Sequence, residues 1–275
     1  MRMLYGLGVL AIGCAAVAQP AVTPDYSKRA APIDPSLATR IGGRWTNPVD
    51  HVVLEITSID PVNGRIGGEE LAPGSASDQI HELVGWVSDA PVKDGFDHVV
   101  PITLTTTLYE YGTLPVWAGF VRGTEIVTVH TLVWPNRTYP WDHVTVGQET
   151  WTKLPAPGEW RKWTADRKLD HMQAIVLADE RTLFAAYDRE RFSAMTCKTC
   201  HGAGAVDRTF KMPNPSLPAL DATPEGFQRL AKEKPAALAF MGKVVRRTAD
   251  LLGEPPFSMQ TNTGFGCFAC HVAKP

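Results

Sequence analysis

Two short segments near the C-terminal end share one pattern of cysteine and histidine. They read Cys197-Lys198-Thr199-Cys200-His201 and Cys267-Phe268-Ala269-Cys270-His271. Two thiols three positions apart on one helical turn can each add to a vinyl group of a porphyrin, and the adjacent histidine can then bind the iron. The pattern predicts two covalently bound c-type haems, with the four cysteines as anchors and His201 and His271 as iron ligands. A zinc site and structural disulfides are the alternatives, and both leave the two histidines unexplained.

Each iron needs a sixth ligand or an open position, and a weak internal repeat offers two methionines. Met172 lies 25 residues before Cys197, and Met241 lies 26 residues before Cys267. Each methionine stands in a helical pattern of apolar residues. A helix with a methionine ahead of each C-x-x-C-H resembles the arrangement in multihaem reaction-centre cytochromes, over roughly residues 165–275. That resemblance implies that Met172 and Met241 are the axial ligands.

Two other residues compete for the first iron. Met212 lies downstream of the first motif, where many small cytochromes carry their methionine, and His171 would complete a bis-histidine site. A further helix is expected from Thr223, as N-cap, to about Lys232. The region 160–275 is therefore predicted to be a mainly helical domain that packs around two cofactors.

The preceding part of the chain follows a period of two rather than a helical period. Alternating apolar residues and turn signals such as Asn63-Gly64 predict eight strands. These are 43–47, 51–59, 65–71, 79–88, 97–109, 115–122, 124–134 and 143–154. Eight short strands with hairpin connections favour a closed, antiparallel up-and-down barrel, which leaves no exposed sheet edge. The interior of such a barrel can hold one small ligand.

Several stretches of this part resemble the avidin/streptavidin barrel in order and spacing. They include Gly43-Arg44-Trp45-Thr46-Asn47, Trp117-Ala118-Gly119 and the run from Gly147 to Leu154. The resemblance spans residues 42–154 and implies the eight-stranded fold. It also implies a ligand pocket in which Asn47 and Glu149 are polar anchors and Trp117 is an aromatic wall.

Other pocket positions depart from the family. His51 and Glu70 replace a serine and a tyrosine that donate to the ligand's carbonyl oxygen, and an anionic carboxylate would repel that oxygen. One aromatic wall falls at Leu132, although Trp134, two residues on, can substitute for it. The resemblance therefore implies a small-molecule pocket with weakened biotin recognition.

The first eighteen residues have the layout of a bacterial export signal, with one arginine, an apolar run and then small residues. Two kinds of processing fit: cleavage after Ala18, or lipidation of Cys14. An Ala/Pro-rich linker follows at 19–40. The protein is thus expected in the periplasm, either free or tethered to the membrane by a lipid, with the barrel at 41–155 and the helical domain at 160–275.

The charge balance excludes one class of partner. A formal net charge of −2 and a pI near 6.4 give no excess of cations for nucleic-acid binding. Residues 160–275 carry 17 Lys and Arg against 12 Asp and Glu. This local excess can offset haem propionates or form a face for an acidic redox partner.

Together these features predict an exported dihaem cytochrome that transfers electrons, with a barrel for ligand binding or assembly into a homo-oligomer. A second hypothesis is a small-molecule binding or sensing protein in which the haems are accessory. A third is a haem enzyme such as a dihaem peroxidase. That enzyme needs a five-coordinate iron beside acid–base groups, and the sequence shows no such set.

Overall fold

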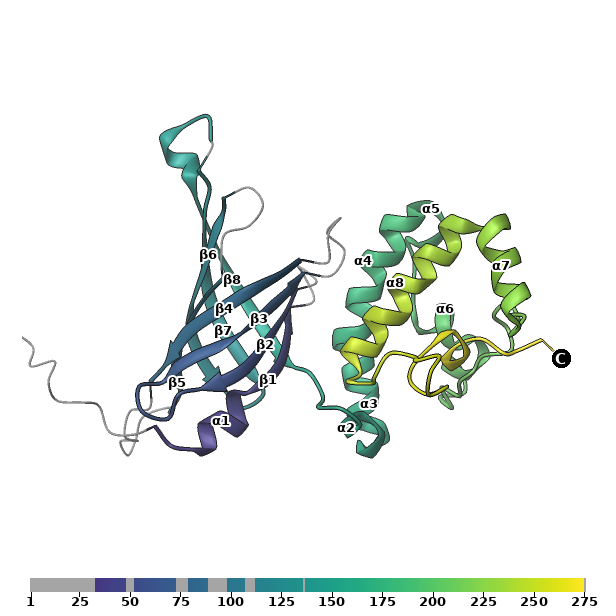
Figure 1. Cartoon of the computed structure of the whole chain (residues 1–275), viewed down its shortest axis with the longest axis horizontal. Coiled ribbons are helices and arrows are strands. Elements are labelled where there is room, and N and C mark those ends of the chain that lie inside the picture. The colour runs from purple at the N-terminus through teal and green to yellow at the C-terminus, as the bar shows by residue number, and fades with distance from the viewer. Residues whose placement is uncertain are drawn as a thin grey trace, which may run out of the picture. The chain divides into compact units, whose positions relative to one another are not determined.

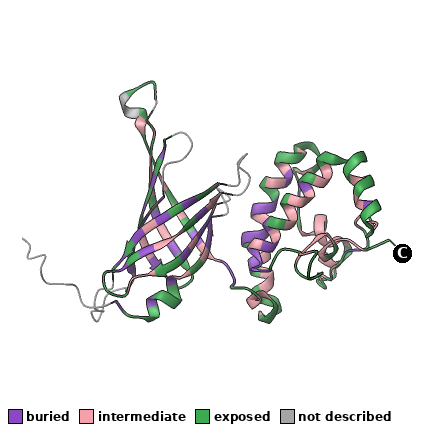
Figure 2. Ribbon diagram, in the orientation of Figure 1, coloured by how far each residue is buried: buried purple, intermediate pink, exposed green. Residues whose placement is uncertain are grey.

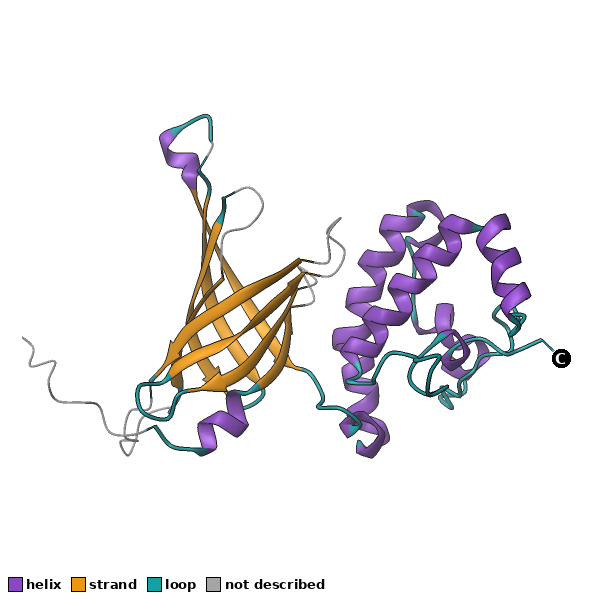
Figure 3. Cartoon of the chain, viewed as in Figure 1, coloured by secondary structure: helices purple, strands orange, loops and turns teal. Residues whose placement is uncertain are grey.

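The computed structural model describes residues 33–47, 52–72, 79–88, 98–106, 112–135 and 137–274. A β-barrel comes first in the chain and a helical region follows it (Figure 1, Figure 3). The predicted export signal and Cys14 lie outside the described residues, and so does His51.

The barrel consists of eight antiparallel strands, as predicted. Each strand pairs with the next one in sequence, and β1 pairs with β8 through Trp45 opposite Lys153, which closes the sheet. The strands are β1 (Gly43–Asn47), β2 (Val52–Ile59), β3 (Arg65–Ala72), β4 (Gln79–Val87), β5 (Val100–Thr106), β6 (Leu114–Arg122), β7 (Glu125–Val133) and β8 (Val144–Lys153).

The inward-facing side chains of the barrel form its core. In β5 the alternation is complete, because Val100, Ile102 and Leu104 are buried while Pro101 and Thr103 are exposed. Buried residues also occupy every second position in β4, at His81, Leu83, Gly85 and Val87 (Figure 2). The apolar part of this core includes Trp45, Leu54, Ile56, Ile66, Leu83, Val121, Ile126 and Trp151.

A short helix packs against this apolar core. α1 (Ser36–Ile41) buries Leu37 and Ile41, and Ile33 joins them in the same core cluster. The indole Nε1 of Trp45 donates a hydrogen bond to the carbonyl oxygen of Ile41 at 2.8 Å. The sequence assigned residues 19–40 to a linker, but its last residues are part of the barrel's core. Six residues contain only one apolar pair at helical spacing, so no periodic pattern marked them.

The helical region follows β8 and is built as expected from the caps and prolines. It contains α2 (Glu159–Lys162), α3 (Ala165–His171), the π-helix η2 (Met172–Val176), α4 (Leu177–Tyr187), α5 (Arg189–Phe192), α6 (Cys197–His201), η3 (Gly202–Ala205), α7 (Pro224–Glu233), α8 (Pro235–Leu251) and η4 (Cys267–Ala269). A further short helix, η1 (Pro140–His143), precedes β8. Thr164 caps α3 by accepting from Arg167 N, and Thr223 caps α7 by accepting from Gly226 N.

Residues 32–275 form one compact unit. Within it, a buried ion pair joins α4 to α8. Arg247 donates to both carboxylate oxygens of Asp179, at 2.6 and 2.9 Å. The same guanidinium also reaches Thr46 Oγ1 of β1 at 3.4 Å. Nearby, Val53 and Leu154 share an apolar cluster with Ile175, Val176, Leu251 and Leu252.

Removing the α1 side chain at position 37 should destabilise the barrel. Leu37→Ala would leave a cavity in a closed core, and such changes cost about 2–5 kcal/mol in the free energy of unfolding. Thr39→Ala, an exposed position on the same helix, is the control and should change stability little. Chemical denaturation of both variants measures the difference. Equal stability would mean that α1 is not part of the folded barrel.

Candidate functional site

The first cysteine motif forms a single capped helical turn. Thr196 accepts a hydrogen bond from the backbone of Lys198, and Thr199 Oγ1 accepts one from the backbone of Thr196. α6 therefore presents Cys197, Cys200 and His201 from one rigid turn. This is the local geometry that the spacing of the motif predicts.

The second motif forms a tighter turn that ends in a fixed histidine. The backbone N–H of His271 donates to the carbonyl oxygen of Cys267 at 2.9 Å. Nδ1 of the His271 ring lies 2.9 Å from the carbonyl oxygen of Pro218. With Nδ1–H donating to that carbonyl, Nε2 is the nitrogen left to bind a metal.

One buried asparagine joins the two motifs. Nδ2 of Asn214 donates to the carbonyl oxygen of Cys200 at 2.9 Å, and the backbone N–H of Asn214 donates to the carbonyl oxygen of Cys270 at 2.9 Å. Its side chain is only 3% exposed. Gly202 follows the first motif at φ +57°, and a Cβ there would come within 2.9 Å of the Asn214 amide. Glycine is therefore required at 202 both for its backbone and for its small size.

The motif cysteines are free thiols in partly buried surroundings. Burial raises the pKa of the Cys200 thiol to about 12 and that of the Cys270 thiol to about 11. Burial also raises the pKa of Cys267. Asn214 bonds to the carbonyl oxygens of both Cys200 and Cys270, so the second cysteines of the two motifs lie near each other.

Two polar atoms beside the motifs are buried without a hydrogen-bond partner among the described residues. They are Nδ1 of His201 and Oε2 of Glu180. The His201 ring packs edge-on against Phe210, with 5.4 Å between ring centroids, and burial lowers the pKa of its imidazole. Few polar atoms in a protein interior lack a hydrogen-bond partner, so each of these two atoms calls for an explanation.

The structure places the candidate methionines in different surroundings. Met241 packs against the apolar cluster of Phe184, Met195 and Phe240, which Cys200 also contacts. Met241 thus shares an apolar cluster with a residue of the first motif, whereas the sequence repeat matched it with the second.

Met172 packs against another apolar cluster. That cluster contains Leu251 and Leu252, and Phe265, two residues before the second motif, packs against it as well. Met172 begins the π-helix η2, a widened turn of a kind that often occurs at functional sites.

The two rivals for the first iron differ as well. The His171 ring is enclosed by Trp160 and Trp163, with ring centroids 5.8 and 5.2 Å away. Its Nε2 lies 2.9 Å from the carbonyl oxygen of Leu251, and burial lowers the pKa of the imidazole. His171 is thus a neutral core histidine whose nitrogen is already bonded. Met212 is half-buried, two residues before Asn214.

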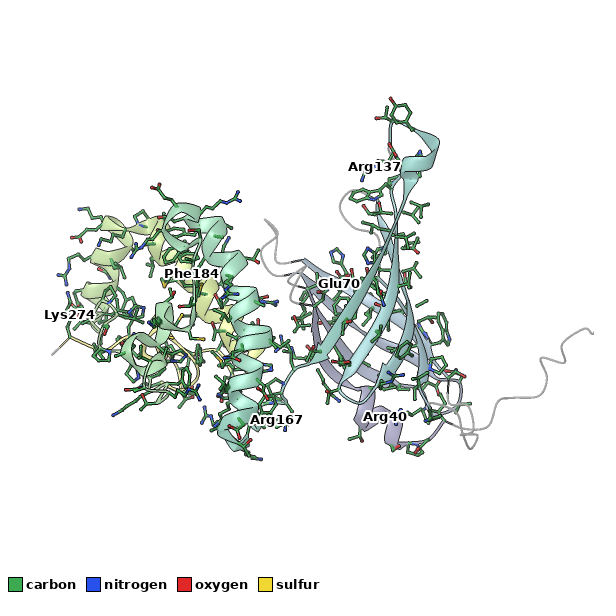
Figure 4. All side chains as sticks on the ribbon, turned by 180° about the vertical axis from the view of Figure 1, so that it is seen from behind. Arg40, Glu70, Arg137, Arg167, Phe184 and Lys274 are labelled. Carbon is green, nitrogen blue, oxygen red and sulfur yellow. The ribbon has the colours of Figure 1, made fainter. Side chains whose placement is uncertain are left out.

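The barrel interior brings together most of the residues of the predicted pocket. Asn47, Glu70 and Trp117 are buried on inward-facing strand positions, and Figure 4 labels Glu70 on the barrel. Glu70 lies opposite His81 in the pairing of β3 with β4. His81 was not identified from the sequence, although its place on an alternating strand marks it as inward-facing.

Glu149 is the centre of a polar network inside the barrel. Its Oε2 accepts a hydrogen bond from Trp117 Nε1 at 2.8 Å, and its Oε1 lies 2.7 Å from His130 Nδ1. Both carboxylate oxygens therefore have partners from the chain itself. His130 was missed in the sequence, although it continues the inward-facing series of Ile126 and Thr128 in β7.

Trp134 lies apart from this network. It follows the last residue of β7, its Nε1 donates to Thr145 Oγ1 at 3.2 Å, and the Arg137 guanidinium stands 4.0 Å from its ring centre. Its ring is thus held by Arg137 of the β7–β8 connection and by Thr145 of β8.

The solved structures that are similar to this chain include those of two avidins, core-bradavidin and xenavidin. No protein-family model and no curated protein matches the sequence. The crystal structure of core-bradavidin is 20% identical over 40% of this chain and 96% of its own, with a TM-score of 0.33. The crystal structure of xenavidin is 20% identical over 42% of this chain and 96% of its own, with a TM-score of 0.34. The closed barrel itself follows from the strand pairings given above.

No three His, Cys, Asp or Glu side chains of the described residues converge as a metal-ion site. Within the same residues, no helix combines the length and the apolar character needed to cross a membrane.

The barrel should not bind biotin with the extreme affinity of avidins. Both oxygens of Glu149 already have partners in the chain, so a ligand N–H that needs this carboxylate would be buried without its hydrogen bond. Such an unmet hydrogen bond costs about 1–3 kcal/mol. Since a factor of ten corresponds to about 1.4 kcal/mol, two or three such defects weaken binding by several orders of magnitude. Calorimetric titration of the full chain should give a dissociation constant well above the nanomolar range. His130→Ala, which frees Oε1 of Glu149, should strengthen any weak binding, and nanomolar binding by the unaltered protein would contradict this account.

Proposed function

We propose that this protein is an exported dihaem c-type cytochrome that transfers electrons, with its barrel serving ligand binding or assembly. The observation that supports this most strongly is the Asn214 link. One buried side chain and its own backbone N–H hold the main chains of both C-x-x-C-H turns. Two attachment turns fixed side by side suit electron exchange between two cofactors.

The residues of the two motifs fit covalent haem. Each turn supplies two free thiols and one histidine, and His271 already has the Nδ1 partner that orients an iron-binding imidazole. Haem attachment would convert these buried thiols, whose pKa values are raised, into thioethers. A thioether has no ionisable proton.

When bound, the haems would supply one-electron redox chemistry at their irons. Cys197, Cys200, Cys267 and Cys270 would anchor them, and His201 and His271 would bind the irons. Asn214 would hold the two turns at a fixed separation, and the apolar cluster of Phe184, Met195 and Phe240 would exclude water from the first. The residues of the chain would thus position the haems and exclude solvent from them.

We propose methionine as the sixth ligand of each iron. The neighbourhood of Cys200 favours Met241 for the first motif, and the neighbourhood of Phe265 favours Met172 for the second. This pairing is crossed relative to the sequence repeat. Met212 remains the competing ligand for the first iron, whereas the enclosure of the buried His171 ring by Trp160 and Trp163 disfavours a bis-histidine site.

The barrel supports a second candidate function, the binding or sensing of a small molecule. The observation that favours it is the polar interior around Asn47, Glu70 and Glu149. In that case the haems accompany or report the ligand. The outer face of the barrel carries exposed Val116, Val129 and Val146 on neighbouring strands, which suits assembly with a second copy of the chain.

The proposed location is the periplasm, because covalent haem attachment and the predicted export signal both indicate that compartment. Lipidation of Cys14 would tether the protein to a membrane. The partner would be another redox protein, with the 17 basic residues of 160–275 as the counterpart of an acidic surface.

Haem content tests the central proposal. Purified protein should carry two haems per chain that stay with the polypeptide in acid acetone, and its denatured mass should exceed that of the bare chain by two haem masses. Replacing both cysteines of either motif by alanine should remove one haem, whereas Cys14→Ser should leave the haem-to-protein ratio unchanged. Bound zinc with no haem would contradict the proposal.

Axial ligation can be tested separately by spectroscopy. Oxidised His/Met haem has a near-infrared band, and Met241→Ala should remove about half of it because one of two irons loses its sulfur ligand. Met172→Ala should remove the other half. Met259→Ala is the control, since that side chain is 89% exposed and belongs to none of the apolar clusters described above. Loss of the band in Met212→Ala instead would assign the first iron to Met212.

A further inference from the structure

Glu180 of α4 is a buried carboxyl group with an incomplete set of partners. Its side chain is only 4% exposed. Oε1 accepts a hydrogen bond from Thr248 Oγ1 at 2.8 Å, while Oε2 is buried with no hydrogen-bond partner among the described residues. A buried, unpartnered carboxylate oxygen is costly, and a proton on that oxygen removes most of the cost.

The charged groups around Glu180 do not neutralise it. On its own helix the neighbour is Asp179, whose negative charge repels it. From α8 come Thr248 and Arg247, and Arg247 is held by both oxygens of Asp179 at 2.6 and 2.9 Å. In the two motifs, the negative charge of Glu180 contributes to the raised pKa of the Cys200 and Cys270 thiols. The geometry agrees for the first motif, because α4 supplies Phe184 to the apolar cluster against which Cys200 packs, and Arg181, next to Glu180, donates to the carbonyl oxygen of Met195 at 2.9 Å.

The protonation equilibrium of this group falls in an accessible range. Burial raises the pKa of Glu180 to about 8, and neither the Thr248 hydrogen bond nor the charge of Arg247 offsets the burial. A change of charge at the neighbouring motifs can then move the carboxyl group between its two forms.

We propose that Glu180 is the proton acceptor coupled to reduction of the haems, taking up one proton on Oε2 when an electron arrives. This inference rests on the proposed function. The electron comes from a one-electron donor protein and the proton from solvent, so an O–H bond forms on Glu180 as one iron changes from ferric to ferrous. Oxidation reverses both transfers.

The direction of the coupling follows from charge. Reduction removes one positive charge near the carboxylate, and the protonated form is then favoured. Of the other titratable groups near the motifs, Asp179 has its own cation, the cysteines become thioethers on attachment, and His201 and His271 are taken as iron ligands. Only Glu180 among these keeps a free site for a proton.

The test is the midpoint potential of the haem-loaded protein, measured by spectroelectrochemistry from about pH 6 to about pH 10, a range that brackets the equilibrium of Glu180. The unaltered protein should show potentials that fall as the pH rises. Glu180→Gln, which cannot ionise, should show potentials independent of pH in this range. Thr248→Val removes the hydrogen bond to the carboxylate and should move the pH-dependent window upward.

Glu190→Gln is the matched control, since Glu190 is an exposed glutamate on α5 and should leave the pH dependence unchanged. A slope that persists in Glu180→Gln would assign the proton to another group, such as a haem propionate, and would overturn the proposal. So would a downward shift of the window in Thr248→Val.

Infrared difference spectra of the unaltered protein give an independent measurement. Reduction should produce a carboxylic C=O band, and that band should be missing in Glu180→Gln. If Glu180→Gln does not mature, the absence of this band in the unaltered protein is enough to overturn the proposal. Failure of the proposed function is seen earlier and separately, as purified protein without haem.

Discussion

The arrangement of the C-terminal region depends on the hydrogen bonds of Asn214. The segments that follow α6 and α8 are mostly irregular, so they have no continuous helix or sheet to fix them. Asn214 bonds to a carbonyl group of each motif, and the chain after it continues along the second motif, where Leu220 N–H donates to Val272 O. Because these groups are buried, breaking one bond leaves an unpaired polar atom, which costs more than the bond itself contributes.

Much of the fold could be predicted because its signals are local. The alternation of Val100, Ile102 and Leu104 identifies a barrel strand, and Thr223 before Pro224 identifies a helix start. α1 could not be predicted in this way. It owes its structure to burial of Leu37 and Ile41 in the barrel core, since a helix of six residues is not stable alone.

The candidate sites were predictable to the same extent. The two C-x-x-C-H turns are read from five consecutive residues each, and Thr196 supplies a local cap. The contacts between distant segments carry no such signal: Met241 packs near Cys200, and Asn214 reaches Cys270. The sequence repeat placed Met241 by its distance along the chain, whereas its neighbours are set by the packing of α8 against α4.

Asp179 and Glu180 are adjacent buried carboxyl groups with opposite surroundings. Successive residues of an α-helix point about 100° apart, so one turn of α4 presents them to different neighbours. Asp179 meets Arg247, which also reaches Thr46 of the barrel, and an ion pair buried in this way is costly to break. The charge of Arg247 favours the ionised form of Glu180, but its hydrogen bonds go to Asp179, and burial prevails and raises the pKa of Glu180. The stability of the α4–α8 contact therefore depends on the Arg247–Asp179 pair, whereas the proton at Glu180 is retained mainly because the carboxyl group is buried.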